Sequence, residues 1–425
     1  MQELRHFFDK DSLSPETFSV MQLCTINEHL LPSLKTLTST EIQGWFIPFI
    51  PLFLSPRTNS VLLSFEFNIP EVTIASAITT LPRLCPNLQD VVLFNSPRSL
   101  EITAAISGML LVTNRNTLQK LDINSPLTKE ASEVLYELPN LCHLSVAIER
   151  ETPLPSASLP NLTMLEITCD DEDGWPQLFH GATFGKLEYV DFYLTSEQIG
   201  DFLGAFKEAA LSSSIHNTLS EFFITAEHPW NPNYYSLLPF TQLVDLRIGM
   251  PCDGGCPSRV DDDIVVSLSR VMPKLETLAL GSAPCGQSTT GVTTKGLLAL
   301  ARHCPKLSTL CVHLQVASLS EPPEIPGMVR NSGPTALRTD CALTELEVGE
   351  TPVPEGSAMI IALTLLRIFP RLGCIVFFDE GWEEVAIAIN FSREIIDFSG
   401  KQCPLTTPRG ALNDRFAGAA LETSG

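Results

Sequence analysis

The sequence predicts an α/β repeat array, in which short strands stack into one curved parallel sheet on the concave side and helices cover the convex side. Three observations lead to this prediction. A short apolar motif recurs about a dozen times along the 425 residues, the segments between its copies have helical periodicity, and a proline often separates a helix from the next strand. Hydrophobic residues make up 44% of the chain and charged residues 18%, which is enough apolar material for an extended core.

The recurring motif is L-x-x-L-x-L, with other apolar residues allowed at each leucine. The clear copies are "PNLQDVVL", "NTLQKLDI", "PNLCHLSV", "PNLTMLEI", "GKLEYVDF", "NTLSEFFI", "TQLVDLRI", "PKLETLAL", "PKLSTLCV", "CALTELEV" and "PRLGCIVF". Two weaker copies precede them, "PSLKTL" with Leu34 and Leu37 inward, and "SVLLSFEF" with Leu62, Phe65 and Phe67 inward. The mean spacing from Leu34 to Leu372 is about 28 residues, which is typical of a leucine-rich repeat solenoid.

The segments between the strands are predicted to be helices. In "TSEQIGDFLGAFKEAAL" (195–211), Ile199, Phe202, Leu203 and Phe206 share one face. "DDDIVVSLSRVMP" (261–273) and "TTKGLLALARHCP" (293–305) have the same pattern, and each begins with residue types that cap helices.

Prolines mark where these helices end. They follow the apolar runs, and a proline cannot continue a helix. They stand at Pro139, Pro273, Pro305 and Pro370. The repeating unit is therefore helix, proline turn and strand, and it needs neighbours to bury both elements.

The chain divides into three predicted parts. Residues 1–31 are expected to form a helical cap or linker, and residues 32–398 a solenoid of about 13 repeats. The tail 399–425 lacks the repeat and is expected to be disordered. The segment 315–342 is rich in Pro, Gly and Ser and is expected to be a long loop.

The alternating x positions of the motif should point to the concave face, because strand side chains have a period of two. This face carries Asp90, Phe94, Asp122, Glu166, Tyr189, Asp191, Tyr193, Glu221, Phe223, Asp245, Arg247, His313, Glu345, Glu347 and Phe378, with Lys120 beside them. Most of these side chains are acidic, and aromatic residues lie among them near the middle. Two interpretations stay open: a surface that binds a basic protein segment, or solvated strand positions of an acidic protein.

The predicted partner-binding residues on this face are Tyr189, Asp191, Tyr193, Glu221, Phe223, Asp245, Arg247 and His313. The centre of the prediction is the group Tyr189, Tyr193, Phe223 and Arg247. Replacing these four with alanine is expected to weaken partner capture without unfolding the array.

The charge of the chain limits its partners. The formal net charge is −22 and the isoelectric point is near 4.7, so the surface repels nucleic acid and anionic lipid, and neither is expected as a partner. The most apolar stretch, "WFIPFIPLFL", is too short to span a bilayer, and the N-terminus lacks the pattern of a secretory signal. We expect a soluble intracellular protein, cytoplasmic or nuclear.

Motifs for catalysis or cofactor binding are lacking. The chain has no G-x-S-x-G, H-E-x-x-H or G-x-G-x-x-G, so a non-enzymatic protein without cofactor or metal is expected. Cys252 and Cys256 lack the second ligand pair of a zinc site, and His143 and His313 are interpreted as solvent-contacting strand residues. The twelve cysteines, such as Cys142, Cys311 and Cys374, are expected to be reduced and buried.

The stretches "LLPSLKTLTS", "LCPNLQDVVL", "LPNLCHLSV", "MPKLETLALG" and "ARHCPKLSTLCVH" carry a family resemblance. From about Leu30 to Phe378 the chain resembles the leucine-rich repeat region of fungal F-box proteins, especially those of mushroom-forming (basidiomycete) fungi. In that family the repeats hold a substrate, while an N-terminal F-box binds the Skp adaptor of a cullin ubiquitin ligase.

The resemblance implies a substrate-recognition module of an SCF-type ubiquitin ligase. The nearest match to the L-P-x-E start of an F-box is "LSPET" (Leu13 to Thr17), which lies too close to the first repeat to leave room for the box. A Skp adaptor is therefore expected as a partner only if an F-box exists upstream. The alternative is a stand-alone leucine-rich repeat scaffold or inhibitor unconnected to ubiquitin.

Overall fold

The computed structural model describes residues 3–7, 15–24, 29–96, 98–113, 115–123, 125–135, 137–148, 159–169, 183–196, 199–251, 260–281, 291–319, 340–349, 351–377 and 380–397. Fourteen strands in this part of the chain form one sheet in chain order. They are β1 (Glu3–Phe7), β2 (Thr36–Ile42), β3 (Ser60–Phe65), β4 (Asp90–Phe94), β5 (Lys120–Ile123), β6 (His143–Ile148), β7 (Met164–Cys169), β8 (Tyr189–Leu194), β9 (Glu221–Ala226), β10 (Asp245–Gly249), β11 (Thr277–Leu280), β12 (Thr309–Val312), β13 (Glu345–Gly349) and β14 (Cys374–Phe377).

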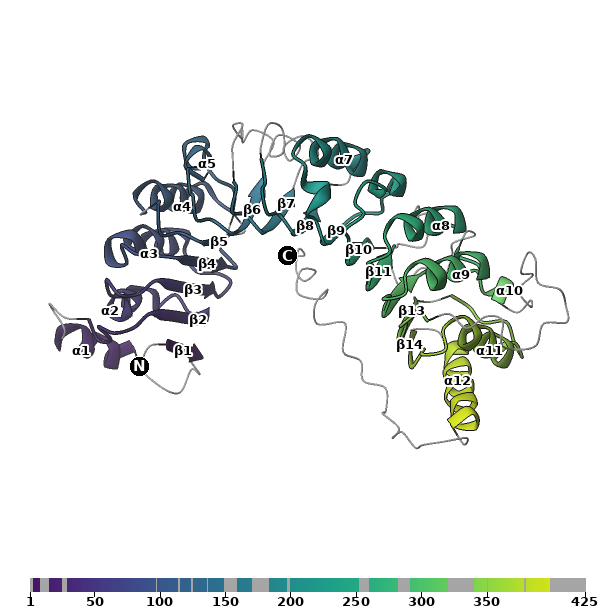
Figure 1. Ribbon diagram of the computed structural model, residues 1–425. Helices are drawn as coiled ribbons and strands as arrows, with labels where there is room; N and C mark the ends of the chain where they lie inside the picture. The colour runs from purple at the N-terminus through teal and green to yellow at the C-terminus, as the bar shows by residue number, and fades with distance from the viewer. Residues whose placement is uncertain are drawn as a thin grey trace, which may run out of the picture.

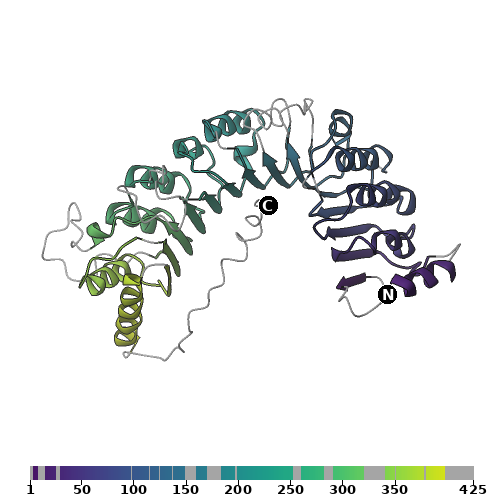
Figure 2. The same cartoon turned by 180° about the vertical axis from the view of Figure 1, so that it is seen from behind.

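All strand pairings are parallel, and helices line the opposite side of the sheet. The helices among the described residues are α1 (Pro15–Cys24), α2 (Ile50–Phe53), α3 (Glu71–Leu84), α4 (Leu100–Val112), α5 (Lys129–Leu135), α7 (Phe202–Ser212), α8 (Asp262–Val271), α9 (Thr294–His303), α10 (Val316–Leu319), α11 (Ala358–Ile368) and α12 (Gly381–Asp397). The stack bends into an arc with the sheet inside and the helices outside (Figure 1), as the reverse view also shows (Figure 2). The predicted solenoid with a concave parallel sheet is confirmed.

Backbone hydrogen bonds connect each repeat to the previous one just before the strand begins. The amide of Asn59 donates to the carbonyl of Lys35 at 2.9 Å, and the amide of Gln89 donates to the carbonyl of Asn59 at 2.7 Å. Equivalent bonds recur along the array as far as Gly373 and Thr344, at 2.8 Å. Parallel strands can pair in this way because the crossover between two strands brings the chain back to the same end of the sheet before the next strand begins.

The inward positions of the motif form the core. Most strands alternate between buried and half-buried residues, and the first leucines Leu88, Leu187 and Leu307 have no exposed surface. One weak repeat was assigned wrongly. In β3 the buried residues are Val61, Leu63 and Phe65, while Phe67 is 75% exposed.

The shift in β3 has a local cause. The inward set lies four residues earlier than predicted, at Thr58, Val61 and Leu63, and Leu62 points to the concave face. Thr58 occupies the place of the first leucine, where its hydroxyl donates to the carbonyl of Leu34 at 3.1 Å. A run of apolar residues on both faces hides the period of two that fixes strand register.

The helical part of the repeat varies more than the strands do. The helix predicted over 195–211 begins only at Phe202, because Asp201 caps it through the amide of Gly204 at 3.0 Å. Three segments of the part that the structure describes are 3₁₀ helices, namely η1 (Ile47–Phe49), η2 (Ile215–Asn217) and η3 (Tyr234–Leu237). In the convex layer, some repeats therefore present one short turn in place of a full helix.

Aromatic side chains close the two ends of the core. At the first end, Phe18 of α1 is 1% exposed and its ring packs against the rings of Trp45, Phe46, Phe49 and Phe53. At the other end, Trp382 of α12 is fully buried and its indole donates to the carbonyl of Thr351 at 2.6 Å. Helices α1 and α12 thus cover apolar surface that no further repeat covers in the described part of the chain.

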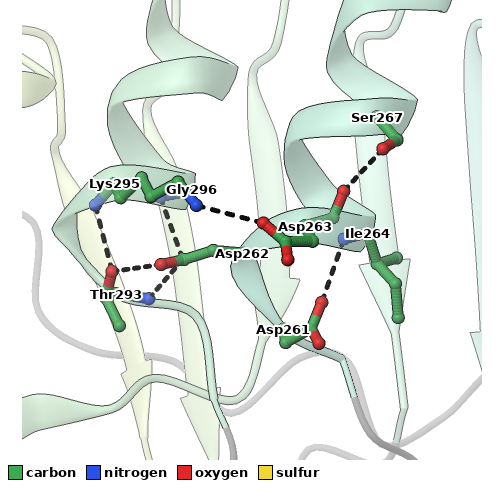
Figure 3. Close-up of polar contacts among 8 residues, drawn as sticks. All are labelled: Asp261, Asp262, Asp263, Ile264, Ser267, Thr293, Lys295 and Gly296. Carbon is green, nitrogen blue, oxygen red and sulfur yellow. Dashed lines mark hydrogen bonds and ion pairs between the residues drawn. The ribbon is translucent and has the colours of Figure 1, made fainter.

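Side chains also join neighbouring repeats on the convex side (Figure 3). Asp261 caps its own helix α8 by accepting from the amide of Ile264 at 3.0 Å. Asp262 reaches the start of the next helix, where its carboxylate accepts from the amides of Thr293 at 2.8 Å and Gly296 at 3.0 Å. The N-terminus of α9 is therefore capped partly by the preceding repeat.

The seven cysteines whose side chains are described are thiols that form no disulfide bond. Cys311 is buried as expected, but Cys142 is half-buried and Cys374 is exposed. Cys374 differs because it takes a concave position on the last described strand, β14, where no further strand shields it.

Several predicted features fall on other residues. The tail 399–425, most of the loop 315–342, the pair Cys252 and Cys256, and Phe378 lie outside the described residues. Residues 1–31, expected to form a helical cap or linker, contribute strand β1 and helix α1. No described helix is both long and apolar enough to cross a membrane.

Candidate partner-binding surface

Strands β8, β9 and β10 bring the centre of the predicted surface together. Along each strand, residues that point to the concave face alternate with buried ones. The sheet register places Asp191, Phe223 and Arg247 side by side on these three strands. In the preceding row, Tyr189, Glu221 and Asp245 also lie side by side. Six of the eight predicted residues therefore form two adjacent rows.

Aromatic contacts join these rows across the strands. The rings of Tyr189 and Phe223 meet edge to face, with centroids 5.1 Å apart and planes at 62°. The guanidinium carbon of Arg247 lies 5.3 Å from the centre of the Phe223 ring. Such contacts are favourable for rings that remain partly hydrated, and they hold Phe223 between a phenol and a cation.

Arg247 is bound to its own strand. Its Nε and Nη2 atoms donate to the two carboxylate oxygens of Asp245 at 2.8 and 2.7 Å. This bidentate pair is half-buried, and it raises the pKa of Arg247. The single arginine predicted for the surface is thus neutralised from within, which leaves the surrounding carboxylates as the main source of charge.

Three nearby carboxyl groups have raised pKa values. Burial is the main cause at Asp191 and at Glu221, where the charge of Asp245 adds to it. Burial also raises the pKa of Glu166 on the adjacent strand β7, with contributions from Asp122 and Asp191. Half-buried carboxylates that repel one another are stabilised in their charged form when a cation approaches.

Hydrogen bonds orient the two tyrosines. The hydroxyl of Tyr189 donates to Oδ2 of Asp191 at 3.4 Å, and that of Tyr193 donates to Oε1 of Glu227 at 2.6 Å. Burial and the neighbouring carboxylates raise the pKa of both phenols. Tyr193 lies further along β8 than Tyr189, so it extends the surface toward the ends of the strands.

His313 is separate from this cluster. It follows β12, two strands beyond β10 in the sheet, and its Nδ1 lies 3.2 Å from the Thr351 hydroxyl. Because neighbouring strands lie about 4.8 Å apart, His313 is about 10 Å from strand β10, which carries Arg247. The prediction therefore joined seven residues that share strands β8 to β10 and one that does not.

A second group on the concave face was not predicted as a site. Lys120 Nζ lies 3.6 Å from Asp122 Oδ2 on β5, and His143 Nε2 lies 3.9 Å from Glu166 Oε1 across β6 and β7. The side chain of His143 is 14% exposed, so it keeps a small contact with solvent, but its Nε2 atom is buried. The sequence offered one signal for this group, namely that the strand pattern places all of its side chains on the concave face. The motif does not show which of these side chains turn toward one another.

Together these features define a repeat protein whose concave face is acidic and carries an aromatic cluster at its centre. No model of a known protein family matches the chain, and no curated protein matches it either.

Proposed function

We propose that the protein is a non-enzymatic interaction module whose concave face binds a basic segment of a partner protein. The observation that carries this proposal is the cluster over β8 to β10, in which Tyr189 and Phe223 lie beside the carboxyl groups of Asp191 and Glu221, while Asp245 is already paired with Arg247. Partly hydrated aromatic rings supply contact area, and carboxylates supply attraction to lysine or arginine. Arg247 acts within the surface, where it holds Phe223 and Asp245 in place.

The resemblance to fungal F-box proteins suggests what the partner is for. In that reading, the repeats are the substrate-recognition part of an SCF-type ubiquitin ligase, and the basic segment belongs to the substrate. The alternative is a stand-alone scaffold or inhibitor that uses the same face without ubiquitin.

Peptide selection tests the binding proposal. Short displayed peptides rich in lysine and arginine, and matched peptides rich in aspartate and glutamate, are panned against the full chain. Basic peptides should be enriched, and their affinity should fall as salt rises. Enrichment of acidic peptides, or of none, would contradict the proposal.

Variants locate the binding site of the selected peptides. Phe223→Ala and Glu221→Gln should each weaken binding about tenfold, since contact area and charge each contribute on the order of 1.4 kcal/mol. Phe94→Ala is the matched control, because Phe94 is an exposed aromatic of the concave face at β4. Equal loss in control and test variants would show that the cluster is not the site.

Co-purification with a recombinant Skp adaptor separates the two roles. If the protein is a ligase subunit with an F-box, the two proteins should stay together through gel filtration. A scaffold or inhibitor should separate from the adaptor. Peptide binding without adaptor binding would favour the alternative.

A further inference from the structure

The second group on the concave face contains the side chains of a metal site. Asp122, His143 and Glu166 come from the adjacent strands β5, β6 and β7, which lie near the middle of the arc (Figure 1). One ligand atom from each lies within 4.8 Å of the other two. In the part of the chain that the structure describes, this is the one group of His, Cys, Asp or Glu side chains brought so close.

The nitrogen of His143 lacks a partner. Nε2 is buried and makes no hydrogen bond, and the nearest carboxylate oxygen, Glu166 Oε1, is 3.9 Å away. A buried polar atom without a partner destabilises the folded chain. An ion between the imidazole and the two carboxylates would satisfy Nε2 and replace the repulsion between the acidic groups.

The distances between the three ligand atoms are slightly longer than those around a bound zinc ion. Zinc binds imidazole nitrogen and carboxylate oxygen at about 2.0–2.2 Å, so two tetrahedral ligands stand about 3.3 Å apart. Glu166 is 30% exposed, and its long side chain can close the difference of about 0.6 Å between its 3.9 Å distance from His143 Nε2 and that spacing. The strand backbones fix the origin of all three side chains, so the site needs rotamer changes alone.

Lys120 competes for the same place. It pairs with His143 in the sheet register, and its ammonium lies 3.6 Å from Asp122. The lysine side chain is 33% exposed, so it can turn toward solvent when a divalent cation enters. Its charge weakens cation binding until then.

We propose that Asp122, His143 and Glu166 bind a divalent transition metal ion, with Zn²⁺ the ion that best suits one imidazole and two carboxylates. Three protein ligands leave a coordination position that faces the concave surface. A ligand from a bound partner, or water, can occupy it. This inference does not depend on the proposed peptide binding, although Glu166 is next to Asp191 in the sheet register.

Calorimetric titration of the chelator-treated full chain with ZnCl₂ tests the proposal. The titrated background carries Cys252→Ser and Cys256→Ser, so that this thiol pair contributes nothing. We expect one zinc ion per chain, with affinity lowered at least about tenfold by His143→Gln and by Glu166→Gln. Lys120→Met should tighten binding, because it removes the competing charge. Glu345→Gln, on the same face at β13, is the matched control and should bind as the parent does.

Cobalt substitution provides a second readout. Co²⁺ in this site should show ligand-field bands without thiolate charge transfer, and His143→Gln should abolish them. Thermal melts should show a zinc-dependent stabilisation that is lost in Glu166→Gln, a substitution at a partly exposed position that keeps the fold. Absence of zinc binding, a cobalt spectrum with thiolate bands, or equal affinity in Glu166→Gln and the parent would overturn the proposal.

Discussion

Three consecutive aspartates at the start of α8 should differ sharply in their contribution to stability. Asp262 bonds to the next repeat, Asp261 bonds within its own helix, and Asp263 forms an ion pair with Lys295 at 3.0 Å on the surface (Figure 3). Replacing each with alanine removes one kind of interaction from otherwise similar positions. Because Lys295 also belongs to the next repeat, the comparison of Asp262 with Asp263 tests whether burial decides how much a side-chain bond between repeats stabilises the solenoid.

The expected magnitudes follow from the contacts. Asp262→Ala leaves the amides of Thr293 and Gly296 without their acceptor, and it removes the bond from the Thr293 hydroxyl at 2.5 Å. Hydrogen bonds to a charged group contribute about 1.5–3 kcal/mol each, but water reaches this half-buried site, so we expect a total loss of about 2–3 kcal/mol. Asp261→Ala loses one helix cap, worth about 1 kcal/mol.

Asp263→Ala is the control. The side chains of Asp263 and Lys295 are 74% and 65% exposed, and an exposed ion pair contributes less than about 0.5 kcal/mol. Asp262→Asn should be intermediate, because the amide oxygen can still accept but carries no full charge.

Urea unfolding gives the order of the free energies, and hydrogen exchange shows where the loss occurs. A loss of 2 kcal/mol corresponds to about a 30-fold rise in local opening, which should appear in peptides from α9 and not in those from α3. The reasoning fails if Asp262→Ala and Asp263→Ala unfold at the same urea concentration, or if the protection of α9 is unchanged.

Four further outcomes are expected. Gly296→Ala should destabilise the chain by about 1–3 kcal/mol in urea unfolding, because a Cβ atom would lie 2.6 Å from both Asp262 Oδ1 and Val292 Cγ1. Alanine favours helices more than glycine does, so a stabilised variant would show that the site is not tightly packed. Phe18→Ala should lower the free energy of unfolding by about 3–5 kcal/mol, since the buried ring of Phe18 packs against four others, and it should speed hydrogen exchange mainly in the first repeats. Faster exchange spread evenly over all repeats would argue against a local end cap. In the folded chain at pH 8, iodoacetamide should label the exposed Cys374 but not Cys85 or Cys304, because burial raises the pKa of Cys85 to about 11 and that of Cys304 to about 12. Labelled Cys85 or Cys304 in mass spectra of the digested protein would show that these thiols are accessible. Burial raises the pKa of Glu347 in the folded state, so the stability associated with its protonated form is present below the unfolded pKa and lost as pH rises through the folded pKa. Glu347→Gln should therefore gain stability relative to the parent as pH rises above 4.5 in urea titrations, and a constant difference would refute the assignment.

The sequence alone determined the path of the sheet and the two faces of its strands. A strand has a side-chain period of two, and the repeated leucines fix which residues point inward, so Tyr189, Asp191 and Arg247 could be placed on the concave face without coordinates. The sequence also placed caps at the starts of α8 and α9, as one of Asp261 to Asp263 and as Thr293 or Thr294, since capping depends on local residue types; the structure uses Asp261 and Thr293. Where apolar residues fill both faces, as around Leu62, the same rule assigned the wrong face.

The tertiary structure decided which side chains meet. Arg247 is paired with Asp245 of its own strand, the carboxylate of Asp262 caps a helix 31 residues later in the chain, and His143 lies between two carboxylates of adjacent strands. These contacts depend on rotamers and on the stacking of one repeat against the next. The motif carries no information on either, because its leucines specify the inner layer and leave the outer side chains free to choose their partners.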